Sequence, residues 1–328
     1  MSARGGERPT FSGVGAQRLK DGAERVIVTG AGGWLGMATL EMLYGLLGDA
    51  FHRRVVCFGS SARTLTLRDG VEIAQSPLEV LGGLPPAPSY LLHLAFLTQE
   101  KANTMSPEAF AAANWGISLT VMSAMNRIGV QAAFLASSGA VYLADNKRAP
   151  RSKRIYGGLK MEDEDRFIGW AENTGARLVI ARIFSLAGPY INKRTSYALS
   201  CFIADALAER PIEVVATHRV YRSYVAIEEM MSVAMGALTA EGSGVVTFDT
   251  AGPAAPELVG VAHAVADTLR PRLKVRRAAL SREATDRYVG DPTNYNALRD
   301  VFRVRPVDFE EQIRQTAAFM AEWPDEPQ

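Results

Sequence analysis

Residues 25–36 read RVIVTGAGGWLG, and they are the strongest indication of the fold in the sequence. A short β-branched run, 25–29, ends at glycines, and apolar residues at helical spacing continue to about residue 48. A buried strand, a glycine-rich turn and a helix in this order can bind the pyrophosphate of a dinucleotide at the helix N-terminus; the alternative is a purely structural turn. The tight turn, the close approach of a pyrophosphate and the packing of helix on strand each need a glycine, here Gly30, Gly33 and Gly36.

Five further apolar runs predict strands, and they alternate with helical stretches. Strands that are apolar throughout and alternate with helices are typical of a parallel sheet covered on both faces. We therefore predict an α/β fold built on a doubly wound parallel Rossmann sheet. The expected strands are 54–58, 71–73, 90–95, 132–137 and 177–182, and the expected helices include 107–128 and 156–174.

The pattern weakens after residue 189 and predicts a smaller α/β lobe that is interwoven with the sheet. We expect helices at 199–208, 228–238 and 308–321, and strands at 212–215 and 223–227. The polar, glycine-rich start of the chain predicts a mobile arm. The expected organisation is a flexible N-terminal arm at 1–24, an NAD(P)-binding Rossmann domain at 25–188, and a substrate-binding lobe at 189–328 with segments that return to the sheet.

The composition is close to the average of soluble proteins and excludes several classes of function. Lys and Arg number 36 and Asp and Glu 35, a net charge of +1, whereas nucleic-acid binding needs a basic face. Apolar residues make up 48% of the chain, which excludes disorder over most of it, but no apolar run approaches the roughly 20 residues that cross a bilayer. Two distant cysteines, Cys57 and Cys201, and the lack of a secretion signal indicate a cytoplasmic protein. The four histidines have no metal-ligand spacing, so we expect no metal.

The residues after the second expected strand favour NADP over NAD. An NAD site usually places an acid about 20 residues after the glycine turn, where it binds the adenosine ribose. This chain has no acid there and offers Ser60, Ser61 and Arg63 instead. Two hydroxyls and a guanidinium can bind a ribose 2′-phosphate, with no carboxylate to repel it. The alternative is that Arg63 is a solvated surface residue.

Ser138, Tyr156 and Lys160 form a candidate proton-transfer unit. Ser138 ends the fifth expected strand, at the carboxyl edge where such sheets place ligands. Tyr156 and Lys160 stand four residues apart and share one helix face. A phenol of pKa about 10 is a poor base at neutral pH, but a nearby ammonium and an oxidised nicotinamide lower that pKa. Tyr156 can then exchange a proton with a substrate hydroxyl, while Ser138 bonds the same oxygen. Glycines at 157 and 158 predict that something packs closely against this turn.

In these residues the sequence resembles the extended short-chain dehydrogenase/reductases of the epimerase/dehydratase type. The resemblance runs from about residue 25 to 321. Its further motifs are HLAF at 93–96, Asn114 with 117–118, RIFSLAGP at 182–189, RPI at 210–212 and RSYVAIEE at 222–229.

The resemblance implies a role for each matching residue. Ser138, Tyr156 and Lys160 would be catalytic. The substrate, a nucleoside-diphosphate sugar, would contact Ser138, Ser185, Asn192, Lys193 and Arg222; Lys193 and Arg222 are ordinary surface cations in the alternative reading. The family commonly dimerises through helices such as 107–128 and 156–174, so a homodimer is expected. The cofactor would contact Gly30, Gly33, Trp34, Leu35, Gly36, Ser60, Ser61, Arg63, Leu94, Ala95, Phe96, Thr98, Asn114, Tyr156, Lys160 and Ile183.

Departures from the family pattern narrow the reaction. Family 4,6-dehydratases carry an Asp-Glu pair just after the strand-five hydroxyl, and this chain has Gly139 and Ala140 there. We therefore expect no 4,6-dehydratase activity. Ser185 stands where many members have Asn, and residues 75–77 read QSP where an Asp often contacts adenine. These two departures affect individual contacts to the cofactor or the substrate and not the fold.

Three hypotheses of function remain. The first is an NAD(P)-dependent sugar-nucleotide epimerase, with an NADP-dependent 4-ketoreductase of a nucleotide-linked keto sugar close behind it. The second is a reductase of a carbonyl compound unrelated to sugars. The third is a non-enzymatic scaffold that senses NADP or serves as a partner subunit, which the intact Ser-Tyr-Lys set disfavours.

Overall fold

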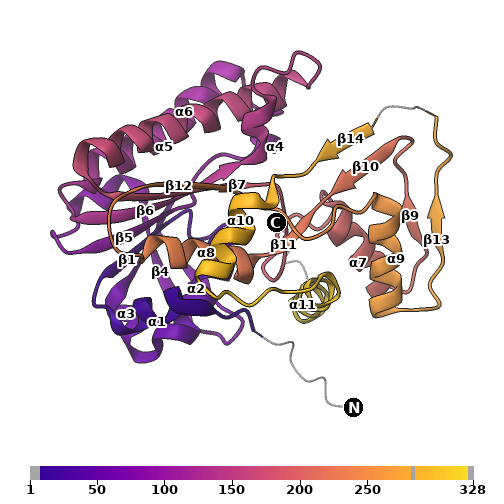
Figure 1. The fold of residues 1–328 in the computed structure, drawn as a ribbon, viewed down its shortest axis with the longest axis horizontal. Coiled ribbons are helices and arrows are strands. Elements are labelled where there is room, and N and C mark those ends of the chain that lie inside the picture. The colour runs from indigo at the N-terminus through magenta and orange to yellow at the C-terminus, as the bar shows by residue number, and fades with distance from the viewer. Residues whose placement is uncertain (1–7, 282–284, 324–328) are drawn as a thin grey trace.

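The structure is a computed structural model that describes residues 8–281 and 285–323. An eight-stranded sheet lies at its centre in the order β12-β7-β6-β5-β1-β2-β4-β3, and every neighbouring pair is parallel except β3 with β4 (Figure 1). The chain builds outward from β1 on one side and then returns to the other, so the predicted doubly wound Rossmann sheet is confirmed. The strands are β1 Arg25–Thr29, β2 Val55–Gly59, β3 Arg63–Thr66, β4 Glu72–Pro77, β5 Ser89–His93, β6 Val130–Ser138, β7 Arg177–Ile183 and β12 Gly244–Asp249.

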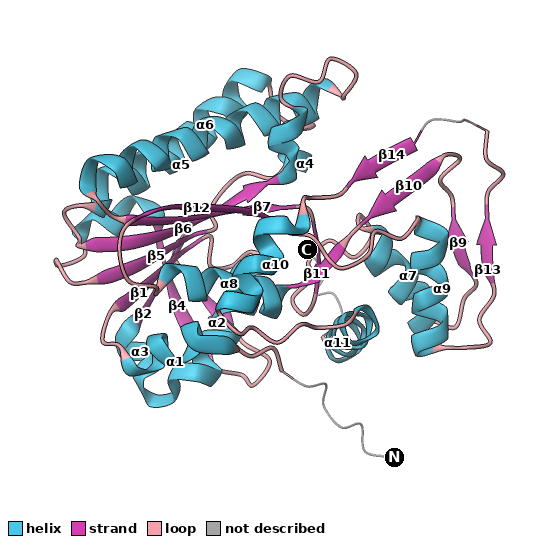
Figure 2. Cartoon of the chain, viewed as in Figure 1, coloured by secondary structure: helices cyan, strands magenta, loops and turns pink. Residues whose placement is uncertain are grey.

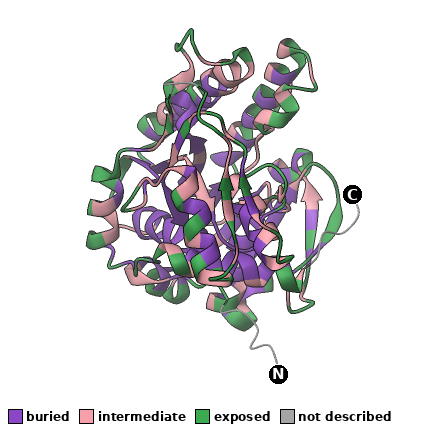
Figure 3. Ribbon diagram, turned by 90° about the vertical axis from the view of Figure 1, so that its right-hand side faces the viewer, coloured by how far each residue is buried: buried purple, intermediate pink, exposed green. Residues whose placement is uncertain are grey.

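Helices cover both faces of the sheet because its inner strands are apolar on both sides. In β1, Val26 and Val28 belong to one core cluster and Ile27 to the other, as the alternation of side chains along a strand requires. α5 (Pro107–Met125) and α6 (Arg151–Thr174) lie on the Ile27 side, and α2 (Trp34–Leu47) and α8 (Ile227–Leu238) lie on the other (Figure 1). Figure 3 shows the buried residues concentrated between these layers.

The expected mobile arm is ordered over the part that the structure describes. Residues 13–21 form helix α1 (Gly13–Asp21), which packs against α8 with Leu19 fully buried. The backbone NH of Thr10 donates to the Glu228 carboxylate at 2.9 Å, before α1 begins. The backbones of α1 and α8 approach each other closely: a Cβ on Gly15 of α1 would lie 2.4 Å from the backbone nitrogen of Gly236 of α8. Residues 1–7 of the expected arm lie outside the described ranges.

In the described part of the second lobe, three helices pack with three short parallel strand pairs (Figure 2). The chain leaves this lobe to add α8, β12 and α10 (Pro292–Val301) to the sheet, so the lobe is interwoven as expected. None of the described helices is long and apolar enough to cross a membrane. The elements of the lobe are α7 Ala198–Leu207, α9 Leu258–Leu269, α11 Phe309–Glu322, and the pairs β8 Ser185–Ala187 with β11 Tyr224–Ala226, β9 Ile212–Val214 with β13 Val275–Arg277, and β10 Arg219–Arg222 with β14 Thr285–Tyr288.

Candidate active site

A cleft of about 940 Å³ runs along the carboxyl ends of the parallel strands, between the sheet and the second lobe. This is where an open α/β sheet with a topological switch point binds its ligands. All but two of the residues expected to contact cofactor or substrate line it. The exceptions are Ser61 and Asn114. Asn114 is buried behind the wall, where its Oδ1 accepts a hydrogen bond from the backbone NH of Leu97 at 2.8 Å, so it shapes the cleft without lining it.

The three glycines of the turn at the start of the cleft have different steric surroundings. Gly30 has φ +71°, and a Cβ there would lie 2.7 Å from the backbone nitrogen of Ala95, which follows the neighbouring strand β5. A Cβ on Gly36 would lie 2.4 Å from the carbonyl oxygen of Gly30, so this glycine lets α2 approach the turn. Gly33 precedes α2, and a Cβ there would meet only the Gly30 oxygen, at 3.3 Å. The open side at Gly33 suits a pyrophosphate on the helix N-terminus.

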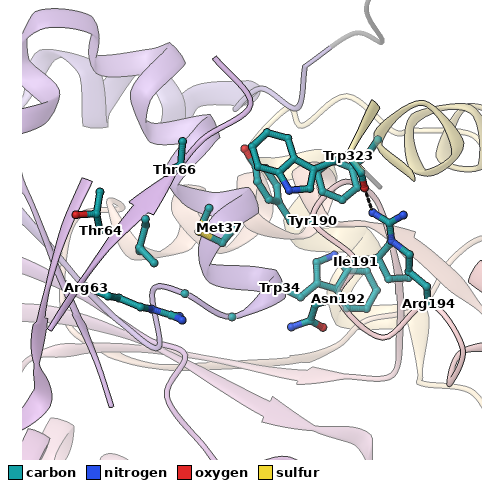
Figure 4. A pocket seen from close by; sticks show the side chains of 14 residues that line it. Trp34, Met37, Arg63, Thr64, Thr66, Tyr190, Ile191, Asn192, Arg194 and Trp323 are labelled. Atoms are coloured by element: carbon teal, nitrogen blue, oxygen red, sulfur yellow. Dashed lines mark hydrogen bonds between the residues drawn. The ribbon is translucent and has the colours of Figure 1, made fainter. Parts of the chain in front are cut away.

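Arg63 lies across the glycine turn. It begins the edge strand β3, and its guanidinium covers Gly32 so closely that a Cβ there would lie 1.7 Å from Nη2. Arg63 also lines a smaller cavity of about 380 Å³, which adjoins the cleft at Gly32 and Gly33 and includes Thr64 and Asn192 in its wall (Figure 4). No residue that lines this cavity is acidic, among those the structure describes.

The catalytic candidates meet because α6 touches the short helix η3 (Gly139–Leu143) that follows β6. A Cβ on Gly157 would lie 2.0 Å from the carbonyl oxygen of Ala140, which confirms the close packing expected at Gly157. The same expectation is wrong for Gly158, whose Cβ would have no described atom within 4 Å. The contact brings Tyr156 beside Ser138 at the end of β6. Burial raises the pKa of the Tyr156 phenol, and the Ser138 hydroxyl acts in the opposite direction. The phenol therefore needs a positive charge beside it to act as a base near neutral pH.

Lys160, on the next turn of α6, is the cation that the sequence predicts for this role. Its Nζ donates to the carbonyl oxygen of Ala136 at 2.6 Å and lies 3.7 Å from the ring centroid of Phe96. Burial lowers the pKa of Lys160 to about 8, against the opposing effect of the carboxylates of Asp163 and Glu164. The side chain is therefore still mostly an ammonium at pH 7.

Two buried contacts fix the helix that carries these residues. Glu164 accepts a hydrogen bond from the Ser137 hydroxyl and pairs with Arg182 at 2.7 Å, which ties α6 to the ends of β6 and β7. His93 of β5 stacks on Phe167 with ring centroids 5.2 Å apart, and its Nδ1 lies 2.7 Å from Thr29 Oγ1. Burial lowers the pKa of His93 to about 4, so the ring is neutral and structural.

Both cations expected to hold the substrate's phosphates are already paired. Lys193 Nζ forms an ion pair with Glu100 of the short helix α4 (Gln99–Ala102). Arg222 Nη2 lies 2.8 Å from Asp286 Oδ2. An anionic substrate must therefore compete with these two carboxylates.

Tyr288 is a residue of the site that no sequence motif predicts. Tyr288 ends β14 and lines the cleft with its Oη 3.3 Å from Ser138 Oγ. No spacing could have revealed it, because 150 residues separate it from Ser138 and its neighbours show no motif.

The comparison with family models shows to which protein family the chain belongs. The model described as "NAD dependent epimerase/dehydratase family" matches residues 26–247, which is more than half of the sequence. The chain belongs to this family. It is therefore an enzyme of the NAD-dependent epimerase/dehydratase family, and the resemblance drawn from its motifs is confirmed. No curated protein matches the chain.

Solved structures of the family share the fold. A UDP-N-acetylglucosamine 4-epimerase from Methanobrevibacter ruminantium, in complex with UDP-N-acetylmuramic acid, is 19% identical with a TM-score of 0.70, over 91% of this chain and 98% of that chain. A dTDP-glucose 4,6-dehydratase from Streptomyces venezuelae, with NAD and TYD bound, is 16% identical with a TM-score of 0.67, over 91% and 97%. RMD from Pseudomonas aeruginosa, complexed with NADPH, is 20% identical with a TM-score of 0.65, over 92% and 99%. At these identities the likeness establishes the fold alone.

Proposed function

We propose that the protein is an NAD(P)-dependent epimerase of a nucleoside-diphosphate sugar. The observation that carries the proposal is the meeting of Ser138, Tyr156 and Lys160 in the cleft that begins at the glycine turn. The cleft volume of about 940 Å³ is at the upper end for small-molecule sites, as a cofactor with a substrate beside it requires. The open face at Gly33 and the lack of a Cβ there fit a bound pyrophosphate.

The chain's own residues would move the proton and orient the substrate. When bound, the nicotinamide supplies the acceptor and donor of a hydride. Tyr156 would take the proton of the substrate hydroxyl as the carbon loses its hydride, and would return it when the hydride comes back on the opposite face. The Lys160 ammonium favours the phenolate, and Ser138 donates a hydrogen bond to the reacting oxygen.

We further propose that the cofactor is NADP. Arg63 lines both the cleft and the adjoining cavity. In the smaller cavity a ribose 2′-phosphate would meet the Arg63 guanidinium, and no described residue that lines that cavity is acidic. Arg63→Ala should weaken NADP binding at least tenfold and leave NAD binding within twofold, because only NADP carries the 2′-phosphate. Fluorescence titration of both cofactors measures this. Equal losses for the two cofactors would contradict the preference.

Two alternatives follow from particular observations. An NADP-dependent 4-ketoreductase would explain Arg63, since NADPH is the usual cellular reductant. A reductase of a carbonyl compound without phosphates would explain why Lys193 and Arg222 are both paired with carboxylates. A thermal-shift panel separates the second alternative: nucleoside diphosphates should raise the melting temperature if they bind, and should leave it unchanged if the substrate lacks phosphate.

We propose that the enzyme is not a 4,6-dehydratase. Elimination needs an acid and a base beside the reacting hydroxyl, and η3 carries Gly139 and Ala140 at these places. NMR analysis of a nucleotide-sugar reaction should show no 4-keto-6-deoxy product. Appearance of that product would overturn this part of the proposal.

A further inference from the structure

A second tyrosine from the other lobe reaches the catalytic hydroxyl. Tyr288 belongs to β14, which pairs with β10 in the second lobe, yet its Oη lies 3.3 Å from Ser138 Oγ at the end of β6. Its ring is held in place by Phe184, with centroids 4.6 Å apart, and by the guanidinium of Arg222, 5.8 Å from its centroid. The phenol is therefore fixed at the reacting end of the cleft.

The hydrogen-bonding capacity of Ser138 makes this contact informative. A serine hydroxyl has one proton to donate and two lone pairs that accept. The backbone NH of Ala140 donates to Ser138 Oγ at 3.2 Å and fills one lone pair. If the Tyr288 phenol donates to the other lone pair of Ser138 Oγ, the Ser138 hydroxyl can donate its own proton toward Tyr156 and the reacting oxygen. The alternative acceptor for Tyr288 is the carbonyl oxygen of Ile183, which is farther away at 3.5 Å.

We propose that Tyr288 is a positioning residue that donates its phenolic hydrogen bond to Ser138 and thereby directs the Ser138 proton toward the reacting oxygen. Burial raises the pKa of Tyr288, so its phenol keeps the proton that it donates near neutral pH. The proposal rests on the proposed function, in which Tyr156 moves the proton. Tyr288 itself neither gains nor loses a proton during turnover.

A double-mutant cycle tests the route through Ser138. Tyr288→Phe should lower kcat about tenfold and leave the substrate KM within twofold, since it removes one hydrogen bond that acts on the reacting oxygen. In a Ser138→Ala background the same change should have no further effect, because the group it acts on is gone. Losses that multiply, or a rise in KM without a fall in kcat, would overturn the proposal.

Tyr221→Phe is the matched control. Tyr221 lies on the neighbouring strand β10, outside the cleft lining, and its ring faces Arg287. Its kcat and KM should stay at wild-type values. Thermal unfolding of all variants shows whether each is folded, and an equal fall in kcat for Tyr221→Phe and Tyr288→Phe would mean that the strand pair, not the Ser138 contact, is responsible.

A measurement without sugar separates this proposal from the proposed function. The Tyr156 phenolate is titrated by ultraviolet difference absorbance in the complex with oxidised cofactor, with Tyr156→Phe as the blank. Tyr288→Phe should raise the midpoint of the Tyr156 titration. Without the hydrogen bond from Tyr288, the Ser138 hydroxyl is no longer held with its proton toward the Tyr156 phenolate, which therefore loses stabilisation. An upward shift supports the positioning role even if no sugar nucleotide is turned over, whereas turnover of a sugar nucleotide with an unshifted midpoint overturns it.

Discussion

Lys160 is a cation held in a place that disfavours charge, and this gives a testable pH dependence. Its pKa is lowered to about 8 by burial, whereas in the unfolded chain it is near 10.4. Below pH 8 both states are charged and the folded state bears the whole cost of burial. Between pH 8 and 10.4 the unfolded state binds more protons than the folded state, so the stability of the wild type rises with pH.

Lys160→Met should therefore inactivate the enzyme and stabilise it. We expect the free energy of unfolding to increase by about 2 to 3 kcal/mol at pH 7, and the difference from wild type to shrink toward zero near pH 10.4. Urea unfolding at pH 7, 8.5 and 10 measures both. A variant less stable than wild type at every pH would show that the hydrogen bond to Ala136 and the Phe96 contact outweigh the cost of the buried charge.

Glu100 reduces the positive charge that the cleft offers to an anionic ligand at Lys193. It neutralises Lys193 at the mouth of the cleft, and this contact lowers the pKa of Glu100, although burial alone would raise it. Glu100→Gln should tighten the binding of a nucleoside diphosphate about fivefold, since the phosphate no longer competes with a carboxylate. Calorimetric titration gives the Kd. Glu79→Gln removes the same charge from the same cleft without touching Lys193, and an equal gain there would mean that only net charge matters.

At the scale of elements, one helix contact brings the candidate catalytic residues together. Gly157 lets α6 touch η3, whereas a Cβ on Gly158 would have nothing within 4 Å in the described part of the chain. Gly157→Ala should lower both the melting temperature and kcat, because α6 must move away from Ser138. Gly158→Ala should keep wild-type kcat and gain about 0.5 to 1 kcal/mol of stability, since alanine favours a helix. If the two variants behave alike, the contact at Ala140 does not position Tyr156.

Most strands and helices could be predicted because the pattern of apolar residues in the sequence matches the pattern of buried positions in the structure. The run at 25–29 is β1 without change of bounds, and the expected strand 177–182 is β7, one residue longer. The edge strand β3 was missed because Arg63, Thr64 and Thr66 are exposed and carry no apolar signal. Helix α1 was missed for a different reason: its sequence is poor in apolar residues, and packing against α8 decides its structure.

A residue of the candidate site could be predicted only where nearby sequence determines its position. Gly33 is recognisable because it lies in a glycine-rich turn between a strand and a helix. Tyr156 is recognisable because it lies four residues before a lysine on the same helix. The ion pairs of Lys193 and Arg222 and the contact of Tyr288 with Ser138 depend on how the second lobe folds onto the sheet, and no local pattern encodes that arrangement.

At the scale of the whole molecule, we propose a homodimer built on α5 and α6. These neighbouring helices expose three large apolar side chains, Trp115, Leu119 and Met161, and Leu119 is 59% exposed. Leu119→Arg should convert the dimer to a monomer in light scattering, because a charge would be buried at the interface. Val301→Arg, on α10 at the opposite side of the sheet, should leave the mass unchanged. A wild-type protein that is already monomeric would contradict the proposal.

The most direct test of an epimerase is to follow substrate and cofactor in one reaction. The purified enzyme is incubated with a nucleoside-diphosphate hexose and catalytic cofactor, while NMR records the sugar and absorbance records the nicotinamide. We predict that the two epimers reach equilibrium with no net change in nicotinamide absorbance, and that Tyr156→Phe binds cofactor but forms no epimer. Sugar conversion that consumes cofactor mole for mole, or an undiminished rate in Tyr156→Phe, would contradict a hydride returned to the same substrate with Tyr156 carrying its proton.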